Sequence, residues 1–294
     1  MKNILVVTGG AGFIGSNLIE ELIKFKKYKI ISIDNYSSGK ILNQIKNSRV
    51  KYLRGDTKNT ESLLKIYKNN IHTIFHFGEF SRIFQSFKKI NECFSSNIEG
   101  SSNLFNFALK NKIKLIYSAT SANLGNKGKD MNLSPYAFSK ARNLELLVNL
   151  KKWFNFKYEI IYFYNVYGPK QICKGDMATV VGIFEEHFKN KKKLPVVKPG
   201  TQTRRFTHVY DTVKACIYVW RKNNSKHYSI ASNERYSILE LVKLFKTKLK
   251  YLPQRKGERF ASALTKMNFN NKIIRLSTKI KLKDYINNFL KNNR

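Results

Sequence analysis

Short strand-like runs alternate with amphipathic segments along the first half of the chain. The strand-like runs cover residues 3–7, 29–33, 50–54, 73–76 and 114–118. Between them, residues 13–25, 61–68 and 91–110 repeat apolar positions at helical spacing. Strands that alternate with helices in this way form parallel sheets. The pattern therefore predicts a parallel α/β sheet with helices on both faces.

The pattern continues past the middle of the chain and then loosens. Ser134-Pro135 predicts the start of a helix that runs to about residue 152, and a strand is expected at 159–164. Beyond it, helical segments at 179–189, 209–222 and 237–250 are separated by short strands and loops. We expect a sheet domain over residues 1–167. Residues 168–294 are expected to form mainly a smaller α/β lobe over the open end of the sheet, from which the chain can cross back.

The composition is that of a folded protein that stays in water. The 294 residues are 42% hydrophobic and 13% aromatic, enough for a large core. No apolar run reaches the roughly 18 residues of a membrane span, and no signal peptide is visible. Cys93, Cys173 and Cys216 are widely spaced and odd in number, which argues against a disulfide framework or a zinc site. We expect a cytoplasmic protein without a metal.

The net charge is strongly positive, because 55 Lys and Arg face 19 Asp and Glu, which gives +36. Such a charge can indicate binding to nucleic acid or to a membrane surface. Here the lysines are scattered through every segment, which favours solvated helix and loop faces. We therefore expect no specific nucleic-acid partner and no membrane partner, although the field would attract an anionic substrate.

A glycine-rich turn follows the first strand. The sequence Gly10-x-Gly12-x-x-Gly15 would form a tight turn that lets the backbone approach a pyrophosphate, with the N-terminus of the next helix behind it. The second strand ends at Asp34, where a carboxylate can accept from a ribose 2′-hydroxyl and repel a 2′-phosphate. The two features predict a Rossmann-type doubly wound sheet and NAD as cofactor. Asp56 follows the third strand, where it could hold an adenine amino group or cap the next helix.

A second constellation lies at the middle of the chain. Tyr136 and Lys140 are four residues apart on one predicted helix and share a face. An ammonium beside a phenol favours the phenolate, which would make Tyr136 a usable base near neutral pH. Thr120 follows the strand at 114–118 at the edge where ligands bind, so its hydroxyl can orient a reacting sugar oxygen; Ser121 is the alternative. Hydroxyls that cap a turn would give the same pattern.

These motifs together resemble the extended short-chain dehydrogenase/reductases, the family of nucleotide-sugar epimerases and dehydratases. The matching stretches lie along nearly the whole chain: residues 8–15, Asp34, 55–56, 75–77, 97–100, 118–120, Tyr136 with Lys140, 164–169 and 202–209. The resemblance implies bound NAD, a nucleotide-diphosphate sugar as substrate, and a homodimer formed through the helices at 91–110 and 135–152.

The resemblance also implies a role for individual residues. Tyr136 would take the proton of the sugar hydroxyl, Lys140 would bind the nicotinamide ribose, and Thr120 would orient the sugar oxygen. The implied cofactor contacts are Gly9, Gly12, Phe13, Ile14, Gly15, Asp34, Asn35, Asp56, Thr57, Phe77, Asn97 and Lys140. The implied substrate contacts are Ser121, Asn165, Arg204 and Arg259, the two arginines facing the pyrophosphate, although solvated surface arginines would look the same.

Some positions depart from the family pattern. Ser121-Ala122 replace the Asp-Glu pair that dehydratases carry after the threonine, which argues against 4,6-dehydration. Glu79 lies where the family has a small or apolar residue, and it would either contact the sugar or be solvated. The expected reaction is epimerisation through a transient 4-keto sugar. A dehydrogenase, ketoreductase or dehydratase of the same family is the nearest alternative, and a catalytically silent NAD- or polyanion-binding protein is the alternative from another class.

Overall fold

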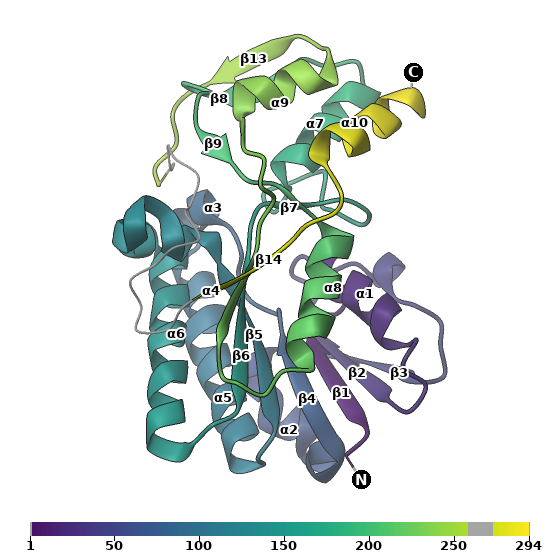
Figure 1. The fold of residues 1–294 in the computed structure, drawn as a ribbon, viewed down its shortest axis with the longest axis vertical. Helices are drawn as coiled ribbons and strands as arrows, with labels where there is room; N and C mark the ends of the chain where they lie inside the picture. Colours follow the sequence, from purple (N-terminus) through teal and green to yellow (C-terminus); the bar gives the residue numbers. More distant parts are fainter. Residues whose placement is uncertain (1, 258–272, 294) are drawn as a thin grey trace.

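Eight parallel strands form one central sheet within residues 2–257 and 273–293, the part of the chain that the computed structural model describes (Figure 1). Their order is β14-β11-β6-β5-β4-β1-β2-β3. The strands are β1 (Ile4–Thr8), β2 (Lys29–Asp34), β3 (Val50–Arg54), β4 (Ile71–His76), β5 (Lys114–Thr120), β6 (Tyr158–Phe163), β11 (His227–Ile230) and β14 (Ile274–Leu276). Each neighbouring pair is parallel. The predicted Rossmann-type sheet is confirmed.

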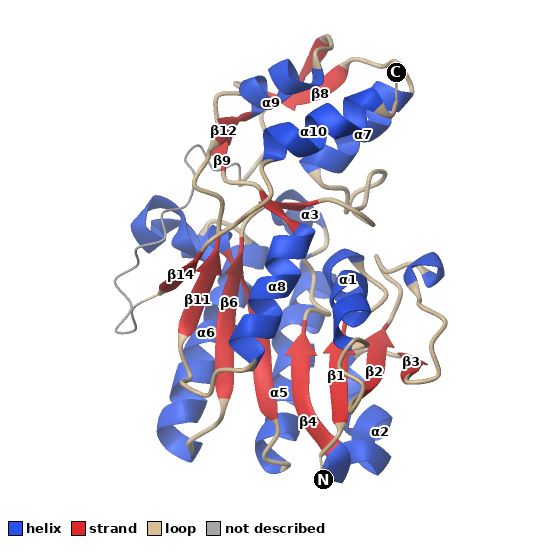
Figure 2. Cartoon of the chain, turned by 45° about the vertical axis from the view of Figure 1, so that its right-hand side comes forward, coloured by secondary structure: helices blue, strands red, loops and turns tan. Residues whose placement is uncertain are grey.

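Helices cover both faces of this sheet (Figures 1 and 2). One face packs against α1 (Phe13–Leu22) and α8 (Val209–Trp220), with Leu18, Ile19 and Val213 in its core. The other face packs against α2 (Thr60–Leu64), α5 (Ser101–Lys110) and α6 (Pro135–Phe154). The six inner strands are almost entirely buried, whereas the edge strands β3 and β14 are partly exposed.

A smaller α/β lobe lies over the carboxyl edge of the sheet (Figure 2). Its elements are α7 (Val180–Lys189), β8 (Leu194–Val197), β9 (Thr203–Arg204), β12 (Tyr236–Ser237), α9 (Ile238–Phe245), β13 (Leu249–Leu252) and α10 (Leu282–Lys291). Phe184, Leu241 and Phe245 lie in its own buried core. Two short strands, β7 (Val166–Tyr167) and β10 (Thr207–His208), pair where the chain passes from the sheet to the lobe.

Three predicted helices differ from the structure. Residues 237–250 are helical only to Phe245, since Lys246 turns into the left-handed region (φ 52°) and β13 then pairs with β8. Residues 61–68 form α2 and then a 3-10 segment, Lys65–Asn70. Residues 91–110 divide into α4 (Ile90–Phe94), a π-helical turn at Ser95–Gly100, and α5. Helices α3 (Ile83–Lys88) and α10 were not predicted.

Part of the positive charge has a structural use at the amino edge of the sheet, where helices end. Lys2 donates to the carbonyl oxygens of Asn111 and Lys112, which follow α5, at 3.2 Å each. Lys114 donates to the carbonyl oxygen of Trp220, the last residue of α8, at 2.6 Å. Cations at helix C-termini satisfy orphan carbonyls and favour the helix dipole. Among the described residues, no helix has the length and apolar character of a membrane span.

Candidate functional site

A cavity of about 740 Å³ lies between the carboxyl edge of the sheet and the lobe. Its walls bring together most of the residues that the sequence singled out. Those that line it are Gly9, Gly12, Phe13, Ile14, Gly15, Asp34, Asn35, Asp56, Thr57, Phe77, Thr120, Ser121, Tyr136, Lys140, Asn165 and Arg204. Ligands of doubly wound sheets bind at this edge, so the cavity is the candidate active site.

The glycine turn is closed by backbone contacts that leave no room for side chains. Gly9 has φ +68°, and its carbonyl oxygen accepts from the Gly12 N–H at 3.0 Å. A Cβ on Gly15 would lie 2.2 Å from the same oxygen. Helix α1 begins after Gly12 without a side-chain cap, so its first N–H groups face the cavity. This arrangement fits the diphosphate of a dinucleotide.

Asp34 and Asp56 lie beside the turn at the ends of β2 and β3. Asp34 accepts from the backbone N–H groups of Ala11 (3.0 Å) and Tyr36 (2.8 Å). Burial raises the pKa of Asp34, and these N–H groups act in the opposite direction. Asp56 caps the next turn by accepting from the Lys58 N–H at 3.0 Å, and it also lines the cavity. Its two proposed roles are therefore compatible.

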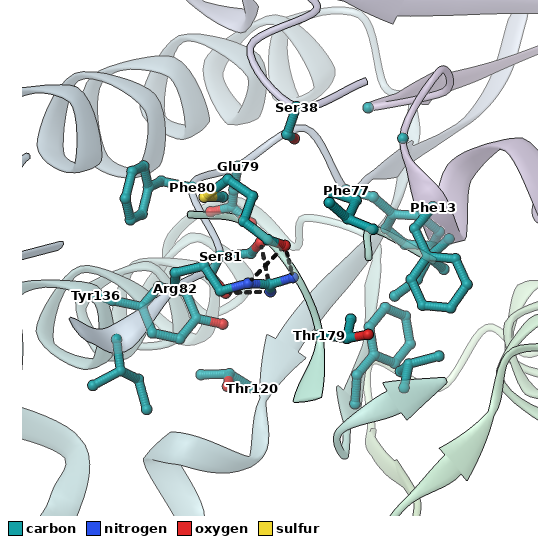
Figure 3. A pocket seen from close by; sticks show the side chains of 18 of the residues that line it. Phe13, Ser38, Phe77, Glu79, Phe80, Ser81, Arg82, Thr120, Tyr136 and Thr179 are labelled. Atoms are coloured by element: carbon teal, nitrogen blue, oxygen red, sulfur yellow. Dashed lines mark hydrogen bonds between the residues drawn. The ribbon is translucent and has the colours of Figure 1, made fainter. Parts of the chain in front are cut away.

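Tyr136, Lys140 and Thr120 all line the cavity. Ser134 caps α6 by accepting from the Ala137 N–H at 3.1 Å, which orients the first turn with Tyr136 toward the cavity. Lys140 lies one turn further on, with its Nζ 4.2 Å from the centre of the Tyr117 ring. Figure 3 shows the phenol oxygen of Tyr136 pointing between Thr120 and Arg82.

Arg82 is a site residue that the sequence analysis missed. Its Nε donates to the carbonyl oxygen of Met177 at 3.0 Å and its Nη1 to that of Ser81 at 2.9 Å. Burial lowers the pKa of Arg82, and the neighbouring Tyr136 phenol acts in the opposite direction. No motif marks this residue, because its place at the site depends on a loop 95 positions away. Arg82 therefore adds a positive charge near the phenol of Tyr136.

Three of the predicted substrate residues line the cavity: Ser121 directly after β5, Asn165 between β6 and β7, and Arg204 from the lobe. Asn165 adopts φ +37° and donates to the carbonyl oxygen of Arg205 at 2.9 Å. Arg204 lines the cavity from β9. Arg259 lies outside the described residues, and Arg255, which the sequence analysis did not select, lines the cavity.

The side chains of Asn97 and Glu79 are both buried, and only Glu79 lines the cavity. Asn97 does not line the cavity but is fully buried in the π-helical turn, where it accepts from the Phe80 N–H at 2.7 Å and donates to Ser139 at 3.1 Å. Glu79 lines the cavity, so its contact with the sugar stays a prediction, but it is not solvated, because its side chain is 4% exposed and forms an ion pair with Lys140. Among the described residues, no group of three His, Cys, Asp or Glu side chains could hold a metal ion.

Comparison with known sequences identifies the family. Residues 5–231 match the model of the NAD dependent epimerase/dehydratase family. The chain is 31% identical over 265 residues to a UDP-N-acetyl-α-D-glucosaminuronate decarboxylase of Bacillus cytotoxicus, covering 82% of this chain and 79% of that protein. It is 29% identical over 261 residues to an uncharacterised UDP-glucose epimerase of Bacillus subtilis, and the match covers 82% of this chain and 80% of that protein.

Solved structures agree with this result. A UDP-glucose 4-epimerase of Thermotoga maritima with UDP-glucose superimposes with a TM-score of 0.86 at 25% identity, covering 98% of this chain and 97% of that chain. A UDP-N-acetylglucosamine 4-epimerase of Methanobrevibacter ruminantium superimposes with a TM-score of 0.83 at 26% identity, covering 99% and 97%. The chain belongs to the NAD-dependent epimerase/dehydratase family, and its cofactor is NAD.

Proposed function

We propose that this protein is an NAD-dependent epimerase of a nucleotide-diphosphate sugar, acting through a transient 4-keto sugar. The observation that carries the proposal is that Tyr136, Lys140 and Thr120 line the same cavity as the glycine turn. The two superimposed structures described above are 4-epimerases by name, which supports the same choice. Ser121 and Ala122 stand where elimination needs an acid pair, so a dehydratase is less well supported.

The proposed roles follow from the positions of the side chains. Tyr136 as phenolate takes the proton of the sugar hydroxyl, which Thr120 orients through a hydrogen bond. NAD, when bound, accepts a hydride from the same carbon and returns it. After the keto sugar turns over in the cavity, the hydride returns to the opposite face of the carbon, and Tyr136 gives the proton back to the oxygen. The net change is inversion at one carbon, without loss of protons or electrons.

The lobe is proposed to select the nucleotide sugar. Asn165 and Arg204 offer an amide and a guanidinium at the cavity wall, and a guanidinium suits the paired oxygens of a pyrophosphate. We place the division between the sheet domain and this lobe at residue 167, with β11 and β14 returning to the sheet.

We also propose a homodimer, because Phe138, Trp153 and Phe154 leave exposed apolar surface on α6. A monomer in light scattering would contradict it.

Native mass spectrometry of freshly purified protein, followed by denaturation, tests this function. We expect release of NAD and a trace of a nucleotide sugar. The sugar panel for turnover assays should include hexuronates, because one relative is named as a glucosaminuronate decarboxylase. Release of nucleic acid without NAD would contradict the epimerase and favour a polyanion-binding protein.

Replacing Asp34 by Ala should weaken NAD binding and relax the choice between NAD and NADP. The residue is 7% exposed and lines the cavity, where its carboxylate would accept from the ribose hydroxyl. We expect the affinity for NAD to fall about tenfold, as for a lost hydrogen bond to a charged group, and the affinity for NADP to rise. Isothermal titration calorimetry with both cofactors measures the change. Asp284→Ala, at an exposed position of α10, is the control, and an unchanged ratio of the affinities for NAD and NADP in Asp34→Ala would contradict the assignment.

A further inference from the structure

The carboxylate of Glu79 is buried beside the proposed catalytic pair. Glu79 follows β4 directly after the Phe77-Gly78 turn, and its side chain and that of Lys140 are each 4% exposed. Its Oε2 accepts from Lys140 Nζ. The same ammonium also donates to the carbonyl oxygen of Ser118, near the end of β5. A buried ammonium needs such partners, because an unpaired charge in the interior is strongly unfavourable.

The other carboxylate oxygen is also fully engaged. Glu79 Oε1 accepts from Ser101 Oγ at 2.9 Å, from the Tyr117 hydroxyl at 3.0 Å and from Asn143 Nδ2 at 3.1 Å. These donors come from α5, β5 and α6, three different elements. Four donors converge on one carboxylate, which fixes its position and leaves it acting only as an acceptor.

One of these donors, Ser101, is the last member of a chain of hydrogen bonds that starts at Thr8, just before the glycine turn. Thr8 Oγ1 accepts from the N–H groups of Phe77 (3.1 Å) and Gly78 (2.9 Å), so its own hydrogen is directed to His76 Nδ1 at 2.8 Å. His76 then donates from Nε2 to Ser101 Oγ at 2.9 Å, and Ser101 donates to Glu79. Burial lowers the pKa of His76 to about 4, in agreement with this neutral ring. The chain links the end of β1 to the partner of Lys140.

The titratable groups around the Glu79–Lys140 pair decide how much positive charge acts on Tyr136. Burial lowers the pKa of Lys140, and the Glu79 carboxylate acts to raise it. Burial also raises the pKa of Tyr117 well above its usual value and that of Cys93 to about 11, so both stay neutral. With His76 neutral as well, Arg82 is the remaining cation of this group that faces the Tyr136 phenol. The negative charge of Glu79 therefore offsets the positive charge that Lys140 presents to Tyr136.

We propose that Glu79 is a positioning residue that anchors Lys140 and balances its charge, and so sets the pH range in which Tyr136 works. The proposal rests on the proposed function in taking Tyr136 as the base. A lone lysine stabilises the phenolate with a full charge. A lysine paired with a carboxylate stabilises it with a dipole, which is weaker. The working range of Tyr136 is thereby placed at higher pH, and Lys140 is held in place before any substrate binds.

Replacing Glu79 by Gln tests the proposal, because the amide keeps the shape and removes the charge. We expect Tyr136 to ionise at a pH lower by on the order of one unit, since the phenolate becomes the counter-ion of Lys140. The readout is the phenolate absorbance of NAD-saturated protein during a pH titration, taken as the difference from the same protein carrying Tyr136→Phe. The acid limb of the kcat/KM profile should shift in the same direction.

Two further variants serve as controls. Glu159→Gln makes the same change of charge on another fully buried carboxylate, which accepts from the N–H groups of Asn224, Ser225 and Lys226. It should leave the Tyr136 titration unchanged. Glu79→Asp keeps the charge and should restore most of the original midpoint. An unchanged midpoint in Glu79→Gln, or an equal shift in Glu159→Gln, would overturn the proposal.

A stability measurement keeps the test decisive if Glu79→Gln does not fold. Removal of one member of a buried ion pair leaves the other charge unpaired, whereas removal of both does not. The double variant Glu79→Gln with Lys140→Met should then melt at a higher temperature than Glu79→Gln alone. If the losses of stability of the two single variants simply add up in the double variant, the proposal is overturned.

If the unaltered protein turns over no sugar while the Tyr136 titration still shifts in Glu79→Gln, the proposed function fails and the role of Glu79 stands. Turnover without any shift would uphold the proposed function and overturn the role of Glu79.

Discussion

The Tyr136→Phe variant should bind NAD as the unaltered protein does and lose roughly a hundredfold to ten-thousandfold in kcat. The substitution removes the phenol oxygen that would take and return the sugar proton, and a positioned base contributes roughly 10²- to 10⁴-fold. The ring stays, so the packing against Ala122 and Ala137 in the small cluster beside the cavity is kept. Turnover is measured with the nucleotide sugar found on the purified protein, and NAD binding by calorimetry.

Tyr218→Phe is the matched control for this variant. Tyr218 lies on α8, is 46% exposed and stands away from the cavity. Loss of its hydroxyl should leave both turnover and NAD binding unchanged. A Tyr136→Phe protein that keeps a tenth or more of the original kcat would show that another group is the base.

The Gly15→Ala variant should lose NAD binding by about a hundredfold or more and be less stable. The new Cβ would lie 2.2 Å from the Gly9 carbonyl oxygen and 2.9 Å from Gly10 Cα, both backbone atoms of the phosphate-binding turn. Relief of such overlap requires the turn itself to move, and overpacking costs about 1–3 kcal/mol. Calorimetry with NAD and thermal unfolding measure the two effects.

Gly175→Ala separates crowding from backbone strain. Gly175 also has positive φ (+79°), but nothing lies within 4 Å of the Cβ that it would gain. This variant should lose only the roughly 1 kcal/mol that a left-handed alanine costs, with NAD binding intact. Equal losses of NAD affinity in the two variants would contradict the role given to the Gly15 contact.

The central sheet could be predicted because most of its strands are indicated by short stretches of consecutive residues. The run at 3–7 is apolar throughout most of its length and becomes β1, which is buried on both faces. The carboxyl edge could be predicted for the same reason, since residues that end neighbouring parallel strands must meet there. The spacing of Tyr136 and Lys140 placed both on one face of α6, and the structure has both in the cavity.

Features that depend on distant pairing could not be predicted. β14 joins the sheet only because it pairs with β11, and the last residues of the predicted helix at 237–250 become β13 because they pair with β8. At these positions the hydrogen bonds between strands far apart in the sequence decide the structure, and the local helical periodicity does not. β-strand formation is decided more by such context than by intrinsic preference.

Glu79 and Asn97 show the same limit within the site. The partner of Glu79 is 61 positions away on α6, so the sequence offered contact with the sugar or solvation and missed the buried ion pair. Asn97 matches a family motif, but the π-helical turn directs it toward Phe80 and Ser139. A motif fixes the type of residue at a position, whereas its partners depend on how the surrounding elements pack.

The central claim is best tested by NMR of a nucleotide sugar that carries deuterium at C4, incubated with the protein and NAD. The account predicts that the C4 epimer appears, that the same ratio is reached from either epimer, and that deuterium stays at C4 because the hydride returns to the carbon that gave it. No NADH should accumulate. Stoichiometric NADH with a released oxidised or keto sugar would contradict the epimerase and identify a dehydrogenase of the same family.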